Sequence, residues 1–244
     1  MYGLSHKNCG VGIVLKSYAK DGAPLAETSL HSELKRQLAQ PGDSLEVPYD
    51  GFFIDIVRDD LLIEIQTRSF SRLRGKLARL LTQNRVHLIH PIPLKKYIIR
   101  AGGDPGEQKK RRSPKHGRLE HLFNEMVYIP DLISHPSFSM EILLTTEEEY
   151  WENTGAGSWR RKGWQITDRR LLSIQETRLF ASKEDYMALL PPGLPQPFTT
   201  ADLAAQAGIP RRLAQKMAYC LKVNEMIRLD GKRGRANNYL KVEG

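Results

Sequence analysis

The stretch from Glu46 to Arg68, with the sequence EVPYDGFFIDIVRDDLLIEIQTR, decides how the first half of the chain folds. Its apolar residues form two runs, Phe52 to Val57 and Leu61 to Ile65, which are typical of β-strands. The polar residues between the runs, Arg58 to Asp60, predict a tight turn. The stretch therefore predicts a β-hairpin.

Each predicted strand carries a carboxylate in its middle, Asp55 in the first and Glu64 in the second. An ionised carboxylate in a buried strand is costly unless it is paired or coordinates a metal. If the strands pair around the turn, Asp55 lies beside Glu64, and the two acids form an oxygen-rich site that suits Mg²⁺ or Mn²⁺. Acidic residues also occur on the solvent face of antiparallel strands, so the pair alone leaves an ordinary surface role open.

A helix is predicted before the hairpin, from Thr28 to Gln40. Leu30, Leu34 and Leu38 recur every four residues and form one apolar stripe. Glu33 lies one position from that stripe. The sequence leaves two interpretations of Glu33 open, a solvated surface residue and a third acid of the site.

A basic helix is predicted directly after the hairpin, over residues 69–83. Arg72, Lys76 and Arg79 share one face of it, separate from its leucine stripe. The beginning of a helix and its cations favour a bound phosphate, and both lie beside the predicted acids. Residues 85–93 predict a further buried strand.

The order helix, strand, strand, helix, strand, with acids at Glu33, Asp55 and Glu64, resembles the PD-(D/E)xK nuclease superfamily, which has the restriction-endonuclease-like fold. The resemblance covers about residues 27–100 and implies an α/β fold, with a mixed-sheet core flanked by helices. The lysine that the family places two positions after the glutamate is Gln66 here. Some members of the superfamily also carry glutamine at that position.

The resemblance implies a nuclease that hydrolyses phosphodiester bonds of DNA with Mg²⁺ or Mn²⁺. Asp55, Glu64 and the Ile65 carbonyl would hold the metal, which activates water and neutralises charge on the phosphate. Gln66 and, from the preceding helix, Glu33 complete the expected catalytic set. Glutamine can form hydrogen bonds but can neither accept a proton nor supply charge. Lys76 or Arg72 could supply that charge instead.

Two alternatives to a DNA nuclease remain open. The first is an inactive nuclease fold that is kept for DNA binding or regulation, as Gln66 suggests. The second is an RNA-processing nuclease. The resemblance also allows a homodimer, because restriction-like enzymes often dimerise to cut both strands.

Composition is consistent with a nucleic-acid partner. The 244 residues allow one large domain or two small ones, and 37 Lys and Arg against 28 Asp and Glu give a net charge of +9. The two cysteines, Cys9 and Cys220, are far apart, which disfavours a disulfide framework and fits a cytoplasmic location. No apolar run approaches the length of about 20 residues that spans a membrane.

Residues 101–118 predict a flexible basic loop, which either contacts phosphates or only improves solubility. A glycine-rich basic segment with Trp159 and Trp164 either stacks bases or caps the core from a hairpin tip. Further strands are predicted to about residue 175. These elements complete a first domain of residues 1–181.

Residues 182–244 resemble a winged helix-turn-helix domain. A capped helix that begins at Thr199, a turn at Gly208, a second helix from Arg211 and a glycine-containing hairpin follow one another after a proline-rich break. In such domains the second helix enters the major groove and the wing touches the backbone or minor groove. The residues expected to contact nucleic acid are Arg68, Arg72 and Lys76 near the acids, Arg211, Arg212, Gln215 and Lys216 on the second helix, and Lys232, Arg233 and Arg235 on the wing.

Overall fold

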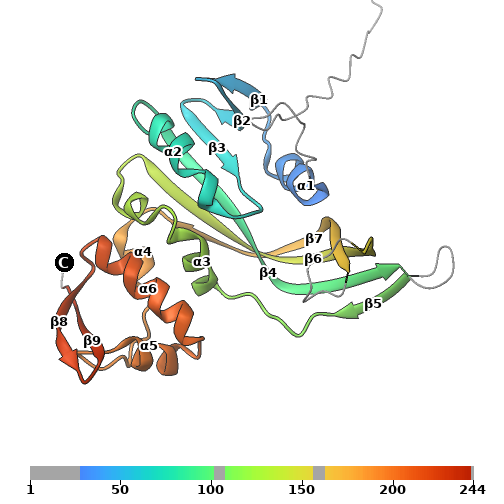
Figure 1. Ribbon diagram of the computed structural model, residues 1–244. Coiled ribbons are helices and arrows are strands. Elements are labelled where there is room, and N and C mark those ends of the chain that lie inside the picture. The colour runs from blue at the N-terminus through green and yellow to red at the C-terminus, as the bar shows by residue number, and fades with distance from the viewer. Residues whose placement is uncertain (1–27, 102–107, 156–162, 243–244) are drawn as a thin grey trace, which may run out of the picture.

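The computed structural model describes residues 28–101, 108–155 and 163–242 (Figure 1). These residues form a mixed α/β fold around one seven-stranded sheet. The first half of the fold consists of α1 (Ser29–Leu38), β1 (Ser44–Tyr49), β2 (Phe52–Arg58), β3 (Leu61–Ile65), the 3₁₀ helix η1 (Phe70–Arg72), α2 (Arg74–Leu80) and β4 (Arg85–Ala101). The predicted hairpin is confirmed as β2 and β3, and β1 is an additional strand that the sequence analysis did not predict.

The sheet combines antiparallel and parallel strands in the order β1-β2-β3-β4-β6-β7. β1, β2 and β3 form an antiparallel meander, and α2 then carries the chain across to β4, which is parallel to β3. β6 (Phe138–Asn153) is parallel to β4, and β7 (Trp164–Phe180) returns antiparallel to β6. The mixed sheet expected from the sequence is therefore present.

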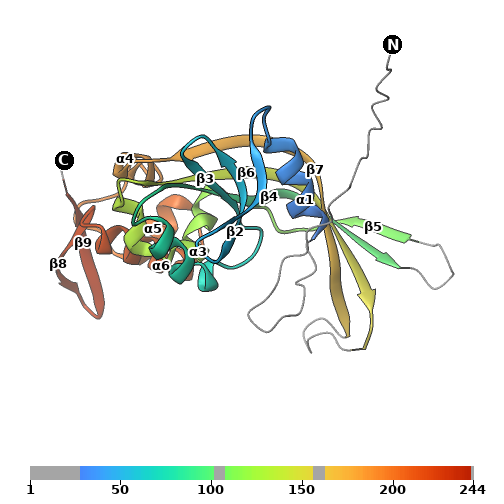
Figure 2. The ribbon, with the colours of Figure 1, turned by 90° about the horizontal axis from the view of Figure 1, so that it is seen from above.

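Helices cover both faces of the sheet (Figures 1 and 2). On one face, Leu30 and Leu34 of α1 pack with isoleucines of β2, β3 and β4. On the other face, α2, α3 (Phe123–Met126) and the C-terminal helices share one larger apolar cluster with the sheet. α1 and α2 therefore approach β2 and β3 from opposite faces.

The long strands β4, β6 and β7 continue past the helix-covered body as projecting hairpins (Figure 2). At 17 residues, β4 spans about 55 Å. Its last residues, from Tyr97, pair with β5 (Gln108–Arg112), which corrects the expectation of a loop over residues 101–118. β5 is exposed along its length, so the main-chain pairing with β4 forms it and burial does not.

The cation of Arg100 lies over the rings of Trp151 and Trp164, at 5.2 and 4.8 Å from the ring centroids. Of the two tryptophans singled out in the sequence, Trp164 thus packs on an arginine within the sheet. Trp159 lies outside the described residues.

The C-terminal part consists of helices followed by a two-stranded antiparallel sheet. In chain order these elements are α4 (Lys183–Met187), α5 (Thr200–Ala207), α6 (Arg211–Val223), β8 (Ile227–Arg233) and β9 (Ala236–Lys241). Thr199 caps α5 as predicted, because its hydroxyl accepts from the Asp202 N–H while the Asp202 carboxylate accepts from the Thr199 N–H. Gly208 ends α5 in the left-handed conformation that glycine adopts without strain.

The C-terminal part shares the apolar cluster with the sheet and is also hydrogen-bonded to the segment that precedes β6. The side chain of Asn224 is buried and donates to the Pro130 carbonyl at 2.8 Å, and Ser134 donates to its Oδ1 at 2.7 Å. Pro130 and Ser134 bound the 3₁₀ helix η3 (Pro130–Ser134), and a further 3₁₀ helix, η2 (Leu119–Leu122), precedes α3. Among the helices of the described residues, none has the length and apolar character needed to cross a membrane.

Candidate functional site

β2 and β3 part at the position where both strands carry an acid. Their main-chain pairing runs from Arg58–Leu61 to Ile56–Ile63 and stops there. Beyond that point the Asp55 side chain replaces a main-chain acceptor, because its Oδ2 accepts the Ile65 N–H at 2.8 Å. Helices on both sides of the sheet reach this gap and complete a cavity.

Asp55 faces a histidine and a lysine of α1. His31 Nε2 lies 3.2 Å from Asp55 Oδ2, and Lys35 Nζ lies 3.4 Å from Asp55 Oδ1. Burial opposes ionisation of Asp55, but the hydrogen bonds from His31 and the Ile65 N–H and the charge of Lys35 outweigh it. The pKa of Asp55 is therefore lowered, and this acid is a carboxylate at neutral pH.

Glu64 is the more deeply buried acid, with 8% of its side chain exposed. Lys76 Nζ contacts Glu64 Oε1 and donates to the Phe53 carbonyl at 2.6 Å. Burial raises the pKa of Glu64 to about 7, although the charge of Lys76 acts in the opposite direction. Glu64 is thus a buried acid whose negative charge is incompletely compensated.

Both acids line one cavity of about 320 Å³, which is called the carboxylate cavity below. Its walls come from α1, the β1–β3 meander, the segment after β3, and α2. Of the residues that the sequence analysis singled out, Asp55, Glu64, Ile65, Gln66, Arg68 and Lys76 line it. The two acids that the hairpin pattern singled out therefore lie in one cavity.

Glu33 is not among the residues that line this cavity. Its Oε2 accepts the Leu171 N–H at 2.6 Å, so the side chain lies between α1 and β7. His31 and Lys35 occupy the face of α1 that was expected to present Glu33. They lie four residues apart on one face, a spacing that is visible in the sequence but was not used.

The resemblance implies one lysine two positions after the glutamate. In this chain Gln66 has that position, and Lys76 supplies the positive charge. Gln66 lines the cavity, but its amide nitrogen donates to the Ser69 carbonyl at 2.8 Å. The cation in contact with Glu64 comes instead from Lys76, one turn into α2. Arg72 lies on the exposed side of η1 and does not line the cavity.

The donor set of the carboxylate cavity is small. Within the part of the chain that the structure describes, no group of three or more His, Cys, Asp and Glu side chains could hold a metal ion. Asp55 and Glu64 supply two carboxylates, and Mg²⁺ is often held by one or two carboxylates together with water and substrate phosphate. The two carboxylates fit such a partly protein-bound cation, which would share Glu64 with Lys76.

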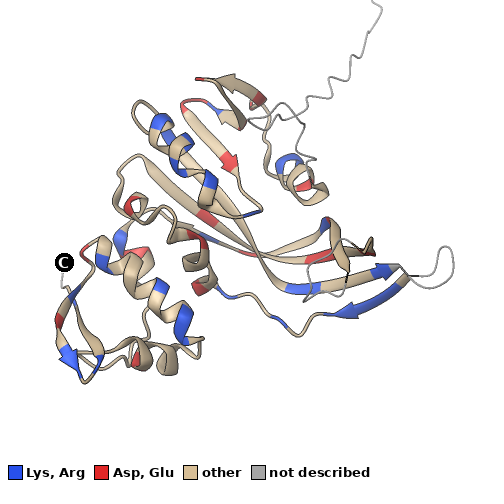
Figure 3. Ribbon diagram, viewed as in Figure 1, with Lys and Arg blue, Asp and Glu red and all other residues tan. Residues whose placement is uncertain are grey.

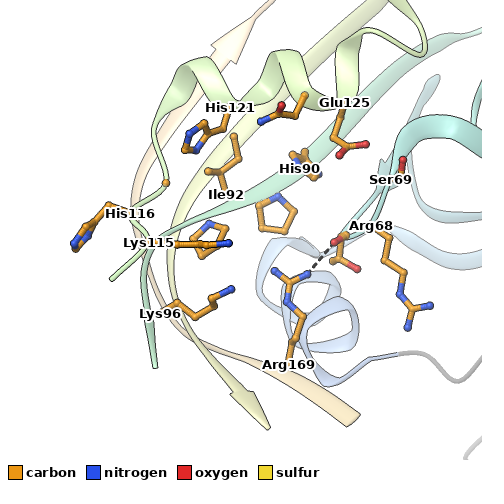
Figure 4. Close-up of a pocket in the computed structure, with 15 residues that line it drawn as sticks. Arg68, Ser69, His90, Ile92, Lys96, Lys115, His116, His121, Glu125 and Arg169 are labelled. Atoms are coloured by element: carbon orange, nitrogen blue, oxygen red, sulfur yellow. Dashed lines mark hydrogen bonds between the residues drawn. The ribbon is translucent and has the colours of Figure 1, made fainter. Parts of the chain in front are cut away.

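A second cavity of about 390 Å³ adjoins the first and shares Thr67 and Arg68 with it. Figure 4 shows the residues that line it, and because four of them are Lys or Arg and one is an acid, it is called the basic cavity below. The cations that line it are Arg68, Lys96, Lys115 and Arg169. The sequence analysis had singled out Arg68 beside the acids and had included Lys115 only in the basic loop of residues 101–118, because the four residues lie in separate segments of the chain.

Most of the C-terminal residues expected to contact nucleic acid are exposed. Figure 3 marks the positions of the basic residues along α6 and the β8–β9 hairpin. Arg211, Arg212 and Gln215 are exposed on α6. Lys216 is an exception, because its Nζ donates to Oδ1 and the carbonyl of Asn124 at 3.0 and 3.3 Å. The outward orientation expected of Lys216 is therefore wrong, and this residue ties α6 to α3.

The three basic residues of the β8–β9 hairpin, Lys232, Arg233 and Arg235, are also exposed. Arg233 is held by an ion pair with Asp202 of the α5 cap. Lys232 and Arg235 have no ion-pair partner within the described part of the chain.

Comparisons with known proteins place the chain in a family without assigning an activity. The family model "Domain of unknown function (DUF8091)" matches residues 28–181, and the chain belongs to this family. A relative from Treponema pallidum (strain Nichols), described as an uncharacterized protein, is 32% identical over 217 residues, which cover 88% of this chain and 85% of the relative. No solved structure matches the chain.

Proposed function

We propose that this member of the DUF8091 family is a metal-dependent nuclease that hydrolyses phosphodiester bonds, with DNA a better candidate substrate than RNA. The observation that carries the proposal is the convergence of Asp55 and Glu64 on one cavity, with Lys76 in contact with Glu64. A basic chain of net charge +9 is consistent with a polyanionic substrate.

The topology around the cavity supports the resemblance to PD-(D/E)xK nucleases. A helix, an antiparallel strand pair with one acid on each strand, a second helix and a parallel strand follow one another in α1, β2, β3, α2 and β4. The departure at Gln66 is offset in this chain by Lys76, which brings a positive charge to the same glutamate from the neighbouring helix. Lys76 would thereby neutralise charge on the substrate phosphate, which glutamine cannot do.

Asp55, Glu64 and the Ile65 carbonyl are the groups that would hold Mg²⁺ or Mn²⁺, and the bound cation would lower the pKa of the attacking water and offset charge on the phosphate. The residues around them prepare the site. The Ile65 N–H and His31 orient the Asp55 carboxylate, and burial keeps Glu64 poised to exchange its proton for a cation.

A winged-helix module is the finer form of the proposal for residues 182–244. Its support is the order α5, tight turn, α6, β8, β9, together with the exposed basic residues at the beginning of α6. Phe198 exchanges main-chain hydrogen bonds with Tyr239 at 2.9 and 2.8 Å, which adds a single antiparallel β-bridge beside the hairpin. Arg211, Arg212 and Gln215 would face DNA, and Lys232 and Arg235 would contact its backbone. Lys216 is left out of this surface.

The test is cleavage of plasmid DNA, single-stranded DNA and RNA with Mg²⁺, Mn²⁺ or EDTA. We expect Asp55→Asn and Glu64→Gln each to lower metal-dependent cleavage by at least about a hundredfold, because each removes a negative charge from the metal site. Asp50→Asn is the matched control, since Asp50 lies in the β1–β2 turn and pairs with exposed Arg79. Cleavage that survives in both Asp55→Asn and Glu64→Gln would remove the proposal.

A second candidate function is nucleic-acid binding without turnover. The observation that favours it is the pairing of both acids with basic side chains, Asp55 with His31 and Lys35 and Glu64 with Lys76. Such pairs could stabilise a site that no longer needs a metal. Binding of labelled DNA by the wild-type protein, without cleavage in either metal, would favour this function.

A further inference from the structure

The basic cavity forms where one edge of β4 has no strand beside it. Pairing with β3 ends at Ile89, and pairing with β5 begins at Tyr97. Pro91 and Pro93 lie in this interval, and because proline has no N–H, they leave no unpaired donor on the open edge. The edge can therefore remain uncovered and form the floor of a cavity.

The segment from Ser113 to Arg118 forms a wall of the cavity and is attached closely to β4. The Gly117 N–H donates to the Pro93 carbonyl at 2.9 Å, and the Ser113 N–H donates to the Lys96 carbonyl at 2.8 Å. A Cβ atom at Gly117 would lie 2.5 Å from the Pro93 oxygen, so only glycine allows this approach. Main-chain hydrogen bonds and close packing therefore fix the segment that carries Lys115 against β4.

Buried carboxylates hold two of the cations of the cavity in position. Arg169 donates to Glu147 at 2.7 Å and to the Thr67 carbonyl at 3.0 Å, and Lys96 donates to Glu149 at 2.6 Å. Glu147 and Glu149 are almost fully buried and do not line the cavity. The Arg169 Nε is buried without a hydrogen-bond partner, so this guanidinium keeps one donor free.

The other two cations of the basic cavity have fewer acidic partners. Neither Arg68 nor Lys115 has a carboxylate partner within the described residues. Glu125 is the one acid among the lining residues, and it accepts the Phe70 N–H at 3.0 Å. In Figure 4 the charged ends of Lys96, Lys115 and Arg169 lie around the same hollow. Such a cluster of cations suits a phosphate group.

We propose that the basic cavity is a subsite for a phosphate of the nucleic-acid strand that is cut in the carboxylate cavity, so the inference rests on the proposed function. The two cavities share Thr67 and Arg68, so one nucleic-acid strand can pass through both. Lys115 and Arg169 would bind the phosphate in the basic cavity, while Arg68 contacts the nucleic acid between the two cavities. A nucleic-acid strand that is bound in both cavities is fixed in register over the acids.

The experiment measures binding without cleavage. Fluorescence anisotropy in EDTA gives the affinity of the full-length protein for labelled 20-mer DNA, single-stranded and duplex, with one phosphate at a time replaced by an uncharged methylphosphonate. Lys115→Gln is the test variant because Lys115 is exposed and its loss leaves no buried group unpaired. Lys95→Gln is the matched control, since Lys95 is exposed on β4 next to Lys96 and does not line the cavity.

We expect Lys115→Gln to lower affinity about tenfold at low salt and to reduce the salt slope by about one, while Lys95→Gln changes neither. One methylphosphonate position should weaken binding to the wild type and have no further effect on Lys115→Gln. The inference is overturned if no position couples to Lys115, or if Lys95→Gln and Lys115→Gln behave alike. An effect confined to 5′-phosphorylated strands would assign the subsite to a strand end, and an effect on unphosphorylated strands as well would assign it to an internal phosphate.

The two proposals can fail separately. If the protein cleaves DNA but no phosphate couples to Lys115, the subsite is removed and the nuclease remains. If the coupling is found and neither metal supports cleavage, the subsite belongs to a binding protein. If neither DNA probe binds the wild type, both proposals are overturned.

Discussion

The carboxylate cavity and the basic cavity lie on either side of Thr67 and Arg68, and they present charge in opposite ways. In the carboxylate cavity the acids belong to the sheet, and the cations reach them from α1 and α2. In the basic cavity the acids are buried in β6 and the cations face the hollow. The sign of the charged side chains that face a cavity, more than the net charge of all residues around it, decides which ligand the cavity suits.

The largest effect should come from Arg169, which supports the wall between the two cavities. Arg169→Leu leaves Glu147 fully buried with only the Thr145 hydroxyl as a partner, and it frees the Thr67 carbonyl. We expect a loss of about 3–5 kcal/mol in the free energy of unfolding, because a buried carboxylate without its cation is strongly destabilising. Urea denaturation measures it.

Arg170→Leu provides the matched control for Arg169. Arg170 is the next residue on β7, its side chain is exposed, and it pairs with Asp168 and lies over the ring of Tyr150. Its loss should cost much less stability than the loss of Arg169, because exposed ion pairs contribute little. Equal effects of the two substitutions would show that the buried pair does not hold the wall.

The carboxylate cavity can be tested through the titration of Glu64 in the metal-free protein. The folded pKa of about 7 lies above the ordinary value of 4.5, so the folded state binds this proton more tightly than the unfolded chain. The stabilisation is complete below about pH 4.5 and is lost as the pH rises through 7. The loss amounts to about 3 kcal/mol by linkage, as an order of magnitude.

Glu64→Gln removes this titration, so the stability of wild type relative to Glu64→Gln should fall between pH 5 and pH 8 in EDTA. The comparison is made by urea denaturation at each pH. Mg²⁺ should restore stability to the wild type more strongly at pH 8 than at pH 5, because cation binding displaces the proton. A difference between the two proteins that is independent of pH would contradict the buried-acid description.

Sequence patterns predicted the carboxylate cavity better than the basic cavity. The reason is that the acids of the carboxylate cavity lie close together in the sequence, whereas the cations of the basic cavity do not. Asp55 and Glu64 lie on two strands joined by a short turn, so local periodicity was enough to pair them. Which face of α1 meets the strands depends on tertiary packing, which is why Glu33 was chosen in place of His31 and Lys35.

The basic cavity has no local signature. Its cations come from the segment after β3, from β4, from the segment after β5 and from β7, and they meet only because β4 has an open edge at its prolines. The same nonlocal pairing turned part of the expected basic loop into β5. An isolated lysine such as Lys115 in a basic run resembles any solvated charge until the fold brings it to the cavity.

The smallest effect concerns the wall of the basic cavity, which Gly117 tests, with Gly75 of α2 as a control glycine outside that wall. Gly117→Ala places a Cβ atom 2.5 Å from the Pro93 oxygen and 2.7 Å from Ile92 Cγ2, so the segment must move away from β4. We expect a loss of about 1–3 kcal/mol in the free energy of unfolding and weaker DNA binding through displaced Lys115. Gly75→Ala has no atom within 4 Å of its new Cβ on α2 and should gain up to about 1 kcal/mol from helix propensity. If Gly117→Ala were as stable as the wild type and kept its affinity for DNA, the close approach of Gly117 to Pro93 would not be what positions Lys115. The basic cavity would then be a chance cluster of cations.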